Sequence, residues 1–468
     1  MKKKIIFLTG KLAYPALLKV LEENPSDKFD YDVVEIGVSV AALATIDIIA
    51  NKFKPNDLKD VDKIVIPGRC KGDIEKLKTL YNNIDVQRGP DELKDLPQFL
   101  GLEGKDIELS NYETQIIAEI TDAPQLTIPR IIKRAEYYKR NGANYIDIGC
   151  IPGTKFPHLE ETIQELKVNN FKVSIDSLNS KDIMRGIKSG VNLILSLQKD
   201  TLWILDETDA KAVVIPDHPK EENEFYETIA SIRSQNKNFI ADPILEPINF
   251  GFSDSIYRYK KLRMNFPDID IMLGVGNLTE LTHCDSIGTN AMLFGIAQEL
   301  KIKYALCTEV SEHCRNAIKE ADISRKFMYK SYEYKMPPKE LSSELLSLRD
   351  IKPFPYSTEE LKDMAKDVKD KNYRIYVNDD GIHVFNNKSY IIEKNPADIY
   401  PKLDIKNDDG HAYYLGMELS RAHISFILGK RYEQDEYLKW GCSVEIDDED
   451  QLNFKTAGHT MRGLNKKK

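Results

Sequence analysis

The sequence contains no apolar run that approaches the ~18 residues of a membrane-spanning helix. The N-terminal stretch "MKKKIIFLTGKLAYP" has basic residues followed by an apolar run of only five residues, from Ile5 to Thr9. A secretory signal peptide needs a longer apolar run, so this segment is predicted to be a β-strand. The sequence therefore predicts a cytoplasmic protein with no membrane partner.

Cysteine and histidine pairs with the spacing of metal ligands are also missing. The chain has six cysteines and eight histidines, without a C-x-x-C motif or a histidine pair at metal-binding spacing. The cysteines are Cys70, Cys150, Cys284, Cys307, Cys314 and Cys442. Their scatter argues against a disulfide framework, a closed zinc or iron–sulfur site and a metal-dependent hydrolase. No metal is predicted.

A basic excess is absent as well. The chain has 75 acidic and 66 basic residues, and its formal net charge is −9. A general nucleic-acid surface or an anionic-membrane surface needs an excess of lysine and arginine. We therefore predict no nucleic-acid partner. With 468 residues, of which 41% are hydrophobic, the chain can form two or three domains.

Residues 1–100 alternate short apolar strands with helical segments. The strands are expected at 4–9, 31–36 and 62–66, and this alternation predicts a small parallel α/β domain of Rossmann or flavodoxin type. "LTGK" at residues 8–11 lacks the spacing of a phosphate-binding loop. "VIPGRCKGD" follows the third strand and fits either a binding loop or a turn with an exposed Cys70 thiol, and we favour the turn.

Residues 111–320 continue the alternation through eight strand–helix repeats. Eight repeats in about 200 residues predict a (β/α)8 TIM barrel, with a doubly wound eight-stranded sheet as the alternative. The regular spacing and the polar residues at the strand ends favour the barrel. The strands are expected at 116–120, 144–149, 171–176, 191–196, 211–216, 238–243, 269–274 and 303–307.

Beyond the barrel, residues 321–371 contain several prolines among charges and are predicted to form a linker or wrapping segment. Residues 372–468 are predicted to form a small α+β domain. It would contain a hairpin with Asp380-Gly381 at its turn, followed by an amphipathic helix that ends at Gly429.

Acidic and amide side chains gather at the carboxyl ends of the predicted barrel strands, where TIM barrels carry their active sites. Isolated carboxylates at one mouth suit a ligand rich in N–H donors, such as an aminopyrimidine edge with its ring N–H and NH2 groups. For Asp176, capping of the following helix is the alternative. The acidic and amide residues at the strand ends are Asp122, Asp147, Asp176, Asp242 and Asn277.

Four stretches of the predicted barrel resemble the pterin-binding superfamily, which comprises dihydropteroate synthases and the pterin-binding methyltransferases that work with corrinoid proteins. The stretches are "NGANYIDIGCIPG" (141–153), "VSIDS" (173–177), "FIADPILEP" (239–247) and "MLGVGN" (272–277). The whole chain resembles the dihydropteroate synthase-related proteins of methanogenic archaea. The resemblance implies a TIM barrel that binds a reduced pterin, either tetrahydrofolate or tetrahydromethanopterin.

The resemblance also implies roles for individual residues. Asp176 and Asp242 would hold the aminopyrimidine edge, Asp147 would support the pocket floor, and Gly274 belongs to the same pterin-binding set. Family members usually place an asparagine at the end of the fourth strand. Here "NLILSLQ" has Asn192 three residues too early, so Ser196 or Gln198 would substitute as the third pterin ligand.

The residues after strands seven and eight separate two reaction types. A dihydropteroate synthase displaces pyrophosphate and needs cationic partners, but the family's lysine is missing here and Glu309 follows strand eight. The methyltransferase branch uses an asparagine after strand seven near pterin N5, and Asn277 stands there. We therefore expect methyl transfer from pterin N5 to a corrinoid protein partner, with Asn277 as the catalytic residue. Condensation of the synthase type, a non-catalytic pterin carrier or sensor, and a homodimer remain alternatives.

Overall fold

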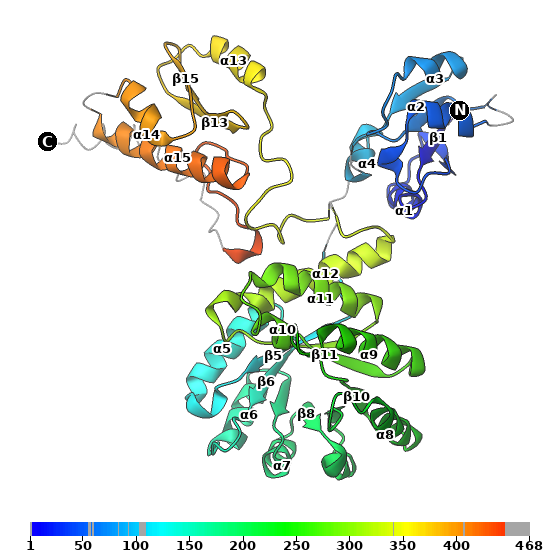
Figure 1. The fold of residues 1–468 in the computed structure, drawn as a ribbon, viewed down its shortest axis with the longest axis vertical. Coiled ribbons are helices and arrows are strands. Elements are labelled where there is room, and N and C mark those ends of the chain that lie inside the picture. Colours follow the sequence, from blue (N-terminus) through cyan, green and yellow to red (C-terminus); the bar gives the residue numbers. More distant parts are fainter. Residues whose placement is uncertain are drawn as a thin grey trace. The chain divides into compact units, whose positions relative to one another are not determined.

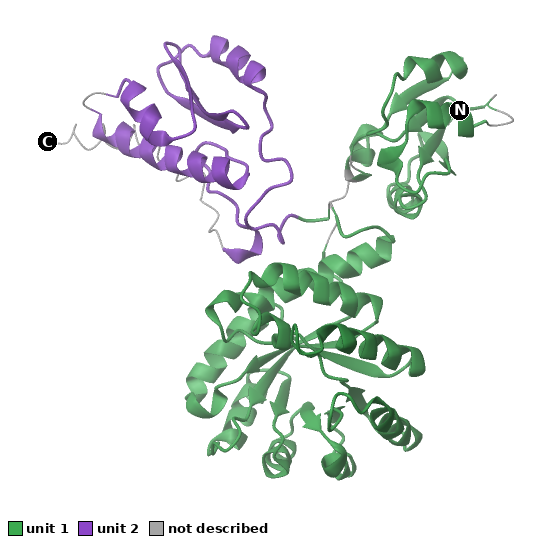
Figure 2. Ribbon diagram, viewed as in Figure 1, with its two compact units in different colours: residues 1–342 green, residues 343–468 purple. Residues whose placement is uncertain are grey.

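The computed structural model describes residues 2–54, 58, 60–82, 84–91, 93–102, 109–339, 341–405 and 408–444. The chain divides into two compact units, residues 1–342 and residues 343–468 (Figure 2). The first unit holds a small parallel sheet and a closed barrel, and the second holds a small antiparallel sheet (Figure 1). The domain boundaries expected from the sequence remain a prediction, and the last part of the expected C-terminal domain lies outside the described residues.

The N-terminal sheet has four parallel strands in the order β2-β1-β3-β4. The predicted small parallel sheet is therefore confirmed, with one strand, β4, in addition to the three expected from the sequence. The strands are β1 (Lys3–Thr9), β2 (Phe29–Glu35), β3 (Lys63–Ile66) and β4 (Asp85–Arg88). The helices are α1 (Tyr14–Glu23), η1 (Ala41–Leu43), α2 (Ile46–Lys52), α3 (Glu75–Leu80), η2 (Leu93–Asp95) and α4 (Leu96–Phe99). Cys70 is buried, so the expectation of an exposed thiol is wrong.

Eight parallel strands close into a barrel, in the order β5 to β12 around the circle. This confirms the TIM barrel and excludes the doubly wound sheet, because β12 pairs with β5. The strands are β5 (Gln115–Ile120), β6 (Tyr145–Gly149), β7 (Val173–Asp176), β8 (Leu193–Leu197), β9 (Lys211–Val214), β10 (Phe239–Ala241), β11 (Asp270–Gly274) and β12 (Tyr304–Cys307).

Helices surround the barrel (Figure 1). They are η3 (Ala123–Gln125), α5 (Ile128–Arg140), α6 (Leu159–Val168), α7 (Ser180–Lys188), η4 (Lys199–Asp206), α8 (Glu222–Ser234), α9 (Phe252–Asn265), α10 (Gly276–Thr279), α11 (Ser286–Glu299), η5 (Glu312–Cys314) and α12 (Ala317–Tyr334). The helix α12 reaches well into residues 321–371, for which the sequence predicted a linker. Within the described residues, no helix is long and apolar enough to cross a membrane.

The barrel has two apolar layers because successive strand residues face opposite sides. One cluster of buried side chains fills the interior, and a larger one lies between the strands and the helices. The interior cluster contains Ile117, Leu193, Leu195, Val213, Ile240, Met272 and Tyr304. On most strands, the residue two positions further along therefore faces the interior nearer the carboxyl end.

The second unit contains an antiparallel sheet in the order β13-β14-β15 with the helix α15 packed against it. The predicted hairpin forms, but Gly381 pairs with Asn378, so Asp379 and Asp380 make the turn and Gly381 begins β14. The predicted helix ends at Gly429, whose φ is +70°. The elements are α13 (Thr358–Asp367), β13 (Arg374–Asn378), β14 (Gly381–Phe385), β15 (Tyr390–Glu393), α14 (Pro396–Ile399), η6 (Tyr400–Lys402), α15 (Asp409–Leu428) and η7 (Gly441–Ser443).

Candidate functional site

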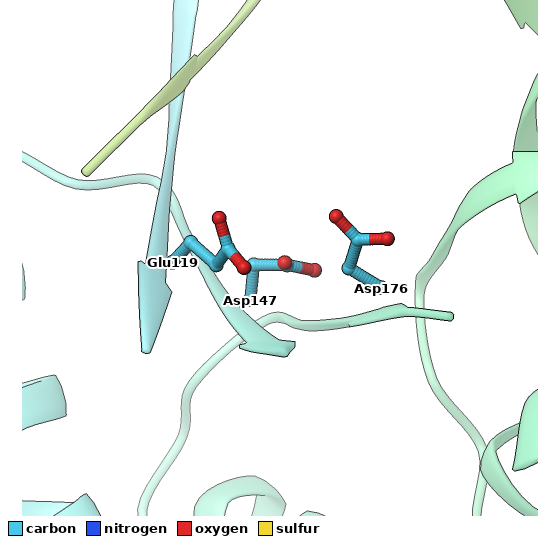
Figure 3. Close-up of side chains that lie close together, drawn as sticks. All are labelled: Glu119, Asp147 and Asp176. Carbon is cyan, nitrogen blue, oxygen red and sulfur yellow. The ribbon is translucent and has the colours of Figure 1, made fainter. Parts of the chain in front are cut away.

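Three carboxylates from adjacent strands meet at the carboxyl end of the barrel: Glu119 of β5, Asp147 of β6 and Asp176 of β7. Oxygen atoms of the three side chains all lie within 4.8 Å of one another. Figure 3 shows the carboxylate of Asp147 between the other two. The strand register accounts for this arrangement, because Glu119 is paired with Asp147 and Gly149 is paired with Asp176. We call these three residues the carboxylate cluster.

Asp147 is the buried centre of the carboxylate cluster. Its side chain has no solvent exposure, and neither of its carboxylate oxygens has a hydrogen-bond partner among the described residues. The hydroxyl of Ser174, the residue paired with Asp147 on β7, is also buried without a hydrogen bond to a described residue. It nevertheless lies near enough to Asp147 to oppose part of the rise in the pKa of this carboxyl group. A buried carboxylate without a partner is costly, so this site is built for something that the protein chain itself does not supply.

Burial and mutual repulsion raise the pKa values of the carboxylate cluster. Burial, followed by the charge of Asp176, raises the pKa of Glu119 to about 8. Burial raises the pKa of Asp176 to about 6, and burial together with the two neighbouring charges holds the pKa of Asp147 well above its usual range. Protons, a cationic or N–H-rich ligand, or a hard divalent cation would each relieve this repulsion. The cluster is therefore where a cofactor or a cation would be held.

Asp242 follows β10, which stands opposite β6 in the barrel. Its Oδ1 accepts hydrogen bonds from the Tyr259 hydroxyl at 2.6 Å and from the Ile244 amide at 2.8 Å. Burial raises the pKa of Asp242 to about 6, and the second oxygen, Oδ2, has no hydrogen bond to a described residue. Asp242 is therefore fixed in orientation, with one oxygen left over for a ligand.

The loop after β10 is also held by Arg258 and Asn277. The Arg258 guanidinium binds the Ile244 carbonyl at 3.0 Å and Glu246 at 2.8 Å. The side-chain amide of Asn277, in the short helix α10, donates to the Leu245 carbonyl at 2.8 Å. Asn277 thus links the end of β11 to the loop that carries Asp242, a contact that the sequence did not predict.

Gly274, Ser196 and Gln198 lie at the strand ends, as expected. Gly274 ends β11, and a Cβ there would meet the Asn277 amide nitrogen at an ordinary 3.5 Å, so close packing does not require glycine. Ser196 lies in an irregular part of β8, and the Gln198 amide donates to the Thr201 hydroxyl at the start of η4. Asn192 lies at the opposite end of β8, where it accepts a hydrogen bond from the Val173 amide. Contact of these residues with a pterin stays a prediction.

The structure changes two points of the sequence interpretation. The helix α7 is capped by Asn179, whose side chain accepts from the Lys181 amide, so the capping alternative for Asp176 is wrong. Glu119 was not among the predicted site residues. The available signal was its position two residues after the interior-facing Ile117 in "IIAEI", which places both side chains on one face of the strand.

A family model and a curated relative match this chain. Residues 3–91 match a family of unknown function, DUF6513. A curated relative, "Uncharacterized protein MJ0107" of Methanocaldococcus jannaschii, is 27% identical over 526 residues, which cover 92% of this chain and 98% of the relative.

Solved dihydropteroate synthases are similar to about half of the chain. The enzyme of Yersinia pestis in complex with a sulfonamide drug is 13% identical with a TM-score of 0.37, and covers 47% of this chain and 94% of its own. The enzyme of Anaplasma phagocytophilum with bound 6-hydroxymethylpterin-monophosphate is 19% identical with a TM-score of 0.36, and covers 46% and 98%. The similarity concerns the fold of this part of the chain.

Proposed function

We propose that the barrel binds a reduced pterin at its carboxyl end, between the carboxylate cluster and Asp242. The observation that carries this proposal is the buried, unpartnered carboxylate of Asp147 between Glu119 and Asp176. A pterin presents a ring N–H and an exocyclic NH2 on one edge, and a carboxylate accepts from both at once. Asp176, with a pKa of about 6, is ionised at neutral pH and is the acceptor that we assign to this edge.

We further propose that the reaction is methyl transfer from pterin N5 to a corrinoid protein. Two acids flank the ends of β11 and β12. Glu280 accepts from the Val310 and Ser311 amides at 2.9 Å, and Glu309 accepts from the Ile318 amide at 3.0 Å. The positive charge of Arg134 on α5 offsets part of the rise that burial causes in the pKa of Glu309. Two acids at this end oppose a pyrophosphate leaving group, which supports methyl transfer over synthase-type condensation.

Calorimetry with tetrahydrofolate and with tetrahydromethanopterin tests the binding proposal. Wild type should bind one of them, and Asp176→Ala should lose about 2 kcal/mol, roughly 30-fold in Kd, because charge-assisted hydrogen bonds are lost. Asp122→Asn is the matched control, because Asp122 is an exposed strand-end acid outside the carboxylate cluster. Binding of neither pterin by folded wild type would refute the proposal.

Two assays separate the reaction types. Transfer from a methyl-tetrahydropterin to reduced cobalamin supports the methyltransferase, and its absence in a protein that binds pterin supports the carrier or sensor. Formation of pteroate from a pterin pyrophosphate and an arylamine at an ordinary turnover would favour the synthase instead.

A further inference from the structure

The N-terminal sheet has a topological switch point between β1 and β3. From β1 the chain moves to β2 on one side, and β3 then pairs with β1 on the other side. In open parallel α/β sheets, ligands bind in the crevice outside the carboxyl ends of the strands at this point. The carboxylate cluster and Asp242 lie in the barrel, so the crevice of the N-terminal sheet is a separate candidate for a binding site.

A cavity of about 320 Å³ lies at this position. That volume is at the lower end of the range for small-molecule sites. The lining comes from the carboxyl ends of β1 and β3, from the segments that follow β3 and β4, from the first turn of α1 and from the segment around η1, and most of it is apolar. Three residues after α12 complete it: Met336, Pro337 and Lys339. Representative lining residues are Leu12, Ala16, Val40, Ile66 and Leu96.

Two glycines bring the surrounding loops together. A Cβ on Gly10, directly after β1, would lie 2.7 Å from the Ala41 nitrogen. A Cβ on Gly68, after β3, would lie 2.2 Å from the Pro90 carbonyl oxygen. Neither position has room for a side chain. The segments "LTGK", which lacks the spacing of a phosphate-binding loop, and "VIPGRCKGD", for which the sequence favoured a turn, thus form walls of one cavity.

The polar groups of the cavity favour an anion. Thr9 is 4% exposed and lines the cavity, and its hydroxyl has no hydrogen bond to any residue that the structure describes. The first turn of α1 lines the cavity through Ala13 and Ala16 without a side-chain cap. The Tyr14 amide donates to the Gly10 carbonyl and Pro15 has no N–H, so among Tyr14, Pro15 and Ala16 the Ala16 amide is the one without a hydrogen bond to a described residue. Two cations, Arg69 and Lys339, line the cavity together with one acid, Asp91. A helix N-terminus and a guanidinium both attract negative charge, and the hydroxyl can donate to it.

We propose that this cavity binds a small organic anion with an apolar body. The body lies among the apolar side chains between β1 and β3. The anionic group lies at the rim, near the Thr9 hydroxyl, the first turn of α1 and Arg69. This ligand is distinct from the pterin, and its binding does not depend on the function proposed for the barrel.

Fluorescence titration of the full chain with 8-anilino-1-naphthalenesulfonate tests the proposal, because this probe combines an aromatic body with one sulfonate. Wild type should show one saturable site. Arg69→Gln should weaken binding about tenfold, and Thr9→Val about threefold, through lost hydrogen bonds to the anion. Ala13→Phe should abolish binding by filling the cavity. Lys3→Gln is the matched control, since Lys3 is an exposed cation at the opposite end of β1.

A neutral probe, N-phenyl-1-naphthylamine, separates the two parts of the proposal. Its binding should be abolished by Ala13→Phe and unchanged by Arg69→Gln. Circular dichroism of each variant verifies that it is folded. The proposal is overturned if the anionic probe does not bind saturably to wild type, or if its binding survives both Ala13→Phe and Arg69→Gln unchanged. Equal affinity for the neutral probe would disprove the anionic part.

Discussion

At the scale of single residues, Asp147 combines full burial with two unpartnered oxygens and two neighbouring carboxylates. We expect Asp147→Asn to raise the free energy of unfolding by about 1–2 kcal/mol at pH 8, because it replaces a buried carboxyl group that repels Glu119 and Asp176 with a neutral side chain that carries an N–H donor. Urea unfolding measures this change, with Asp122→Asn as the exposed control. An unchanged or lower stability of Asp147→Asn would show that repulsion in the carboxylate cluster is not costly.

The raised pKa values of the same cluster predict a pH dependence of stability. The pKa of Glu119 is about 8 and that of Asp176 about 6, both above the usual range near 4 that an unfolded chain would show. Between pH ~4 and the raised pKa values, the folded state binds more protons than the unfolded state. The contribution of these two carboxyl groups to the free energy of unfolding is therefore complete below pH ~4 and is lost as the pH rises toward 8.

Urea unfolding at several pH values between 5 and 8 measures this effect. The free energy of unfolding should fall with rising pH, and Glu119→Gln should reduce the slope by up to about 1.4 kcal/mol per pH unit. A slope that is identical in wild type and Glu119→Gln would contradict the assignment.

Asn277 has two roles that can be tested separately, one in the proposed methyl transfer and one in holding the loop after β10. Asn277→Ala should weaken pterin binding modestly and slow transfer from N5 by ~100-fold, because one positioned hydrogen-bonding group is lost. Loss of the bond to Leu245 should cost only about 1 kcal/mol. Methyl-transfer kinetics and urea unfolding separate these effects.

Asn192→Ala is the control for Asn277→Ala. It removes a similar bond, to the Val173 amide, at the other end of the barrel, and should lower stability alone. A destabilised but fully active Asn277→Ala protein would end the catalytic assignment.

At the scale of elements, α12 is fastened to the amino ends of the barrel strands by one buried arginine. Arg325 is 3% exposed and donates to the Thr114 carbonyl at 2.9 Å and the Gly142 carbonyl at 2.7 Å, and it forms an ion pair with Asp322. Arg325→Leu should lower the free energy of unfolding by about 3 kcal/mol or more, because it removes the donor to two buried carbonyls and leaves Asp322 with Lys326 as its remaining ion-pair partner.

Pterin binding per folded molecule should be unchanged in Arg325→Leu, because the mouth of the barrel lies at the opposite ends of the strands. Thermal unfolding and calorimetry measure the two quantities. Arg130→Leu, an exposed arginine on α5, is the control and should have little effect on either. A folded Arg325→Leu protein with wild-type stability would disprove the fastening role.

At the scale of the whole molecule, all residues assigned to the pterin lie in the first compact unit, residues 1–342. The second unit has a separate apolar core formed by its sheet and α15. We therefore expect a chain ending at residue 342 to fold and to bind pterin within about twofold of the full chain, as for separate domains. Calorimetry measures this affinity. Loss of binding in a folded 1–342 protein would mean that residues 343–468 contribute to the site.

The barrel and most of its acidic site residues could be predicted from the amino-acid sequence. Strand residues alternate between two faces, so the eight apolar strands, their spacing and the acids at their ends were readable from local pattern. The fourth N-terminal strand, β4, could not be predicted because its sequence "DVQR" is mostly polar. Its extended conformation depends on its pairing with β3. The capping of α7 by Asn179 instead of Asp176 depends on one turn of local geometry that the pattern leaves open.

Which side chains meet depends on the packing of the strands and loops in three dimensions. Glu119, Asp147 and Asp176 are each about 30 residues from the next along the chain, and the parallel register of β5, β6 and β7 brings their oxygen atoms within 4.8 Å of one another. The hydrogen bond from Asn277 to Leu245 and the cavity beside Gly10 and Gly68 likewise depend on contacts between segments that are distant along the chain. Sequence periodicity fixes which face a residue occupies, whereas contacts between strands and loops depend on how the sheet closes and where each loop returns.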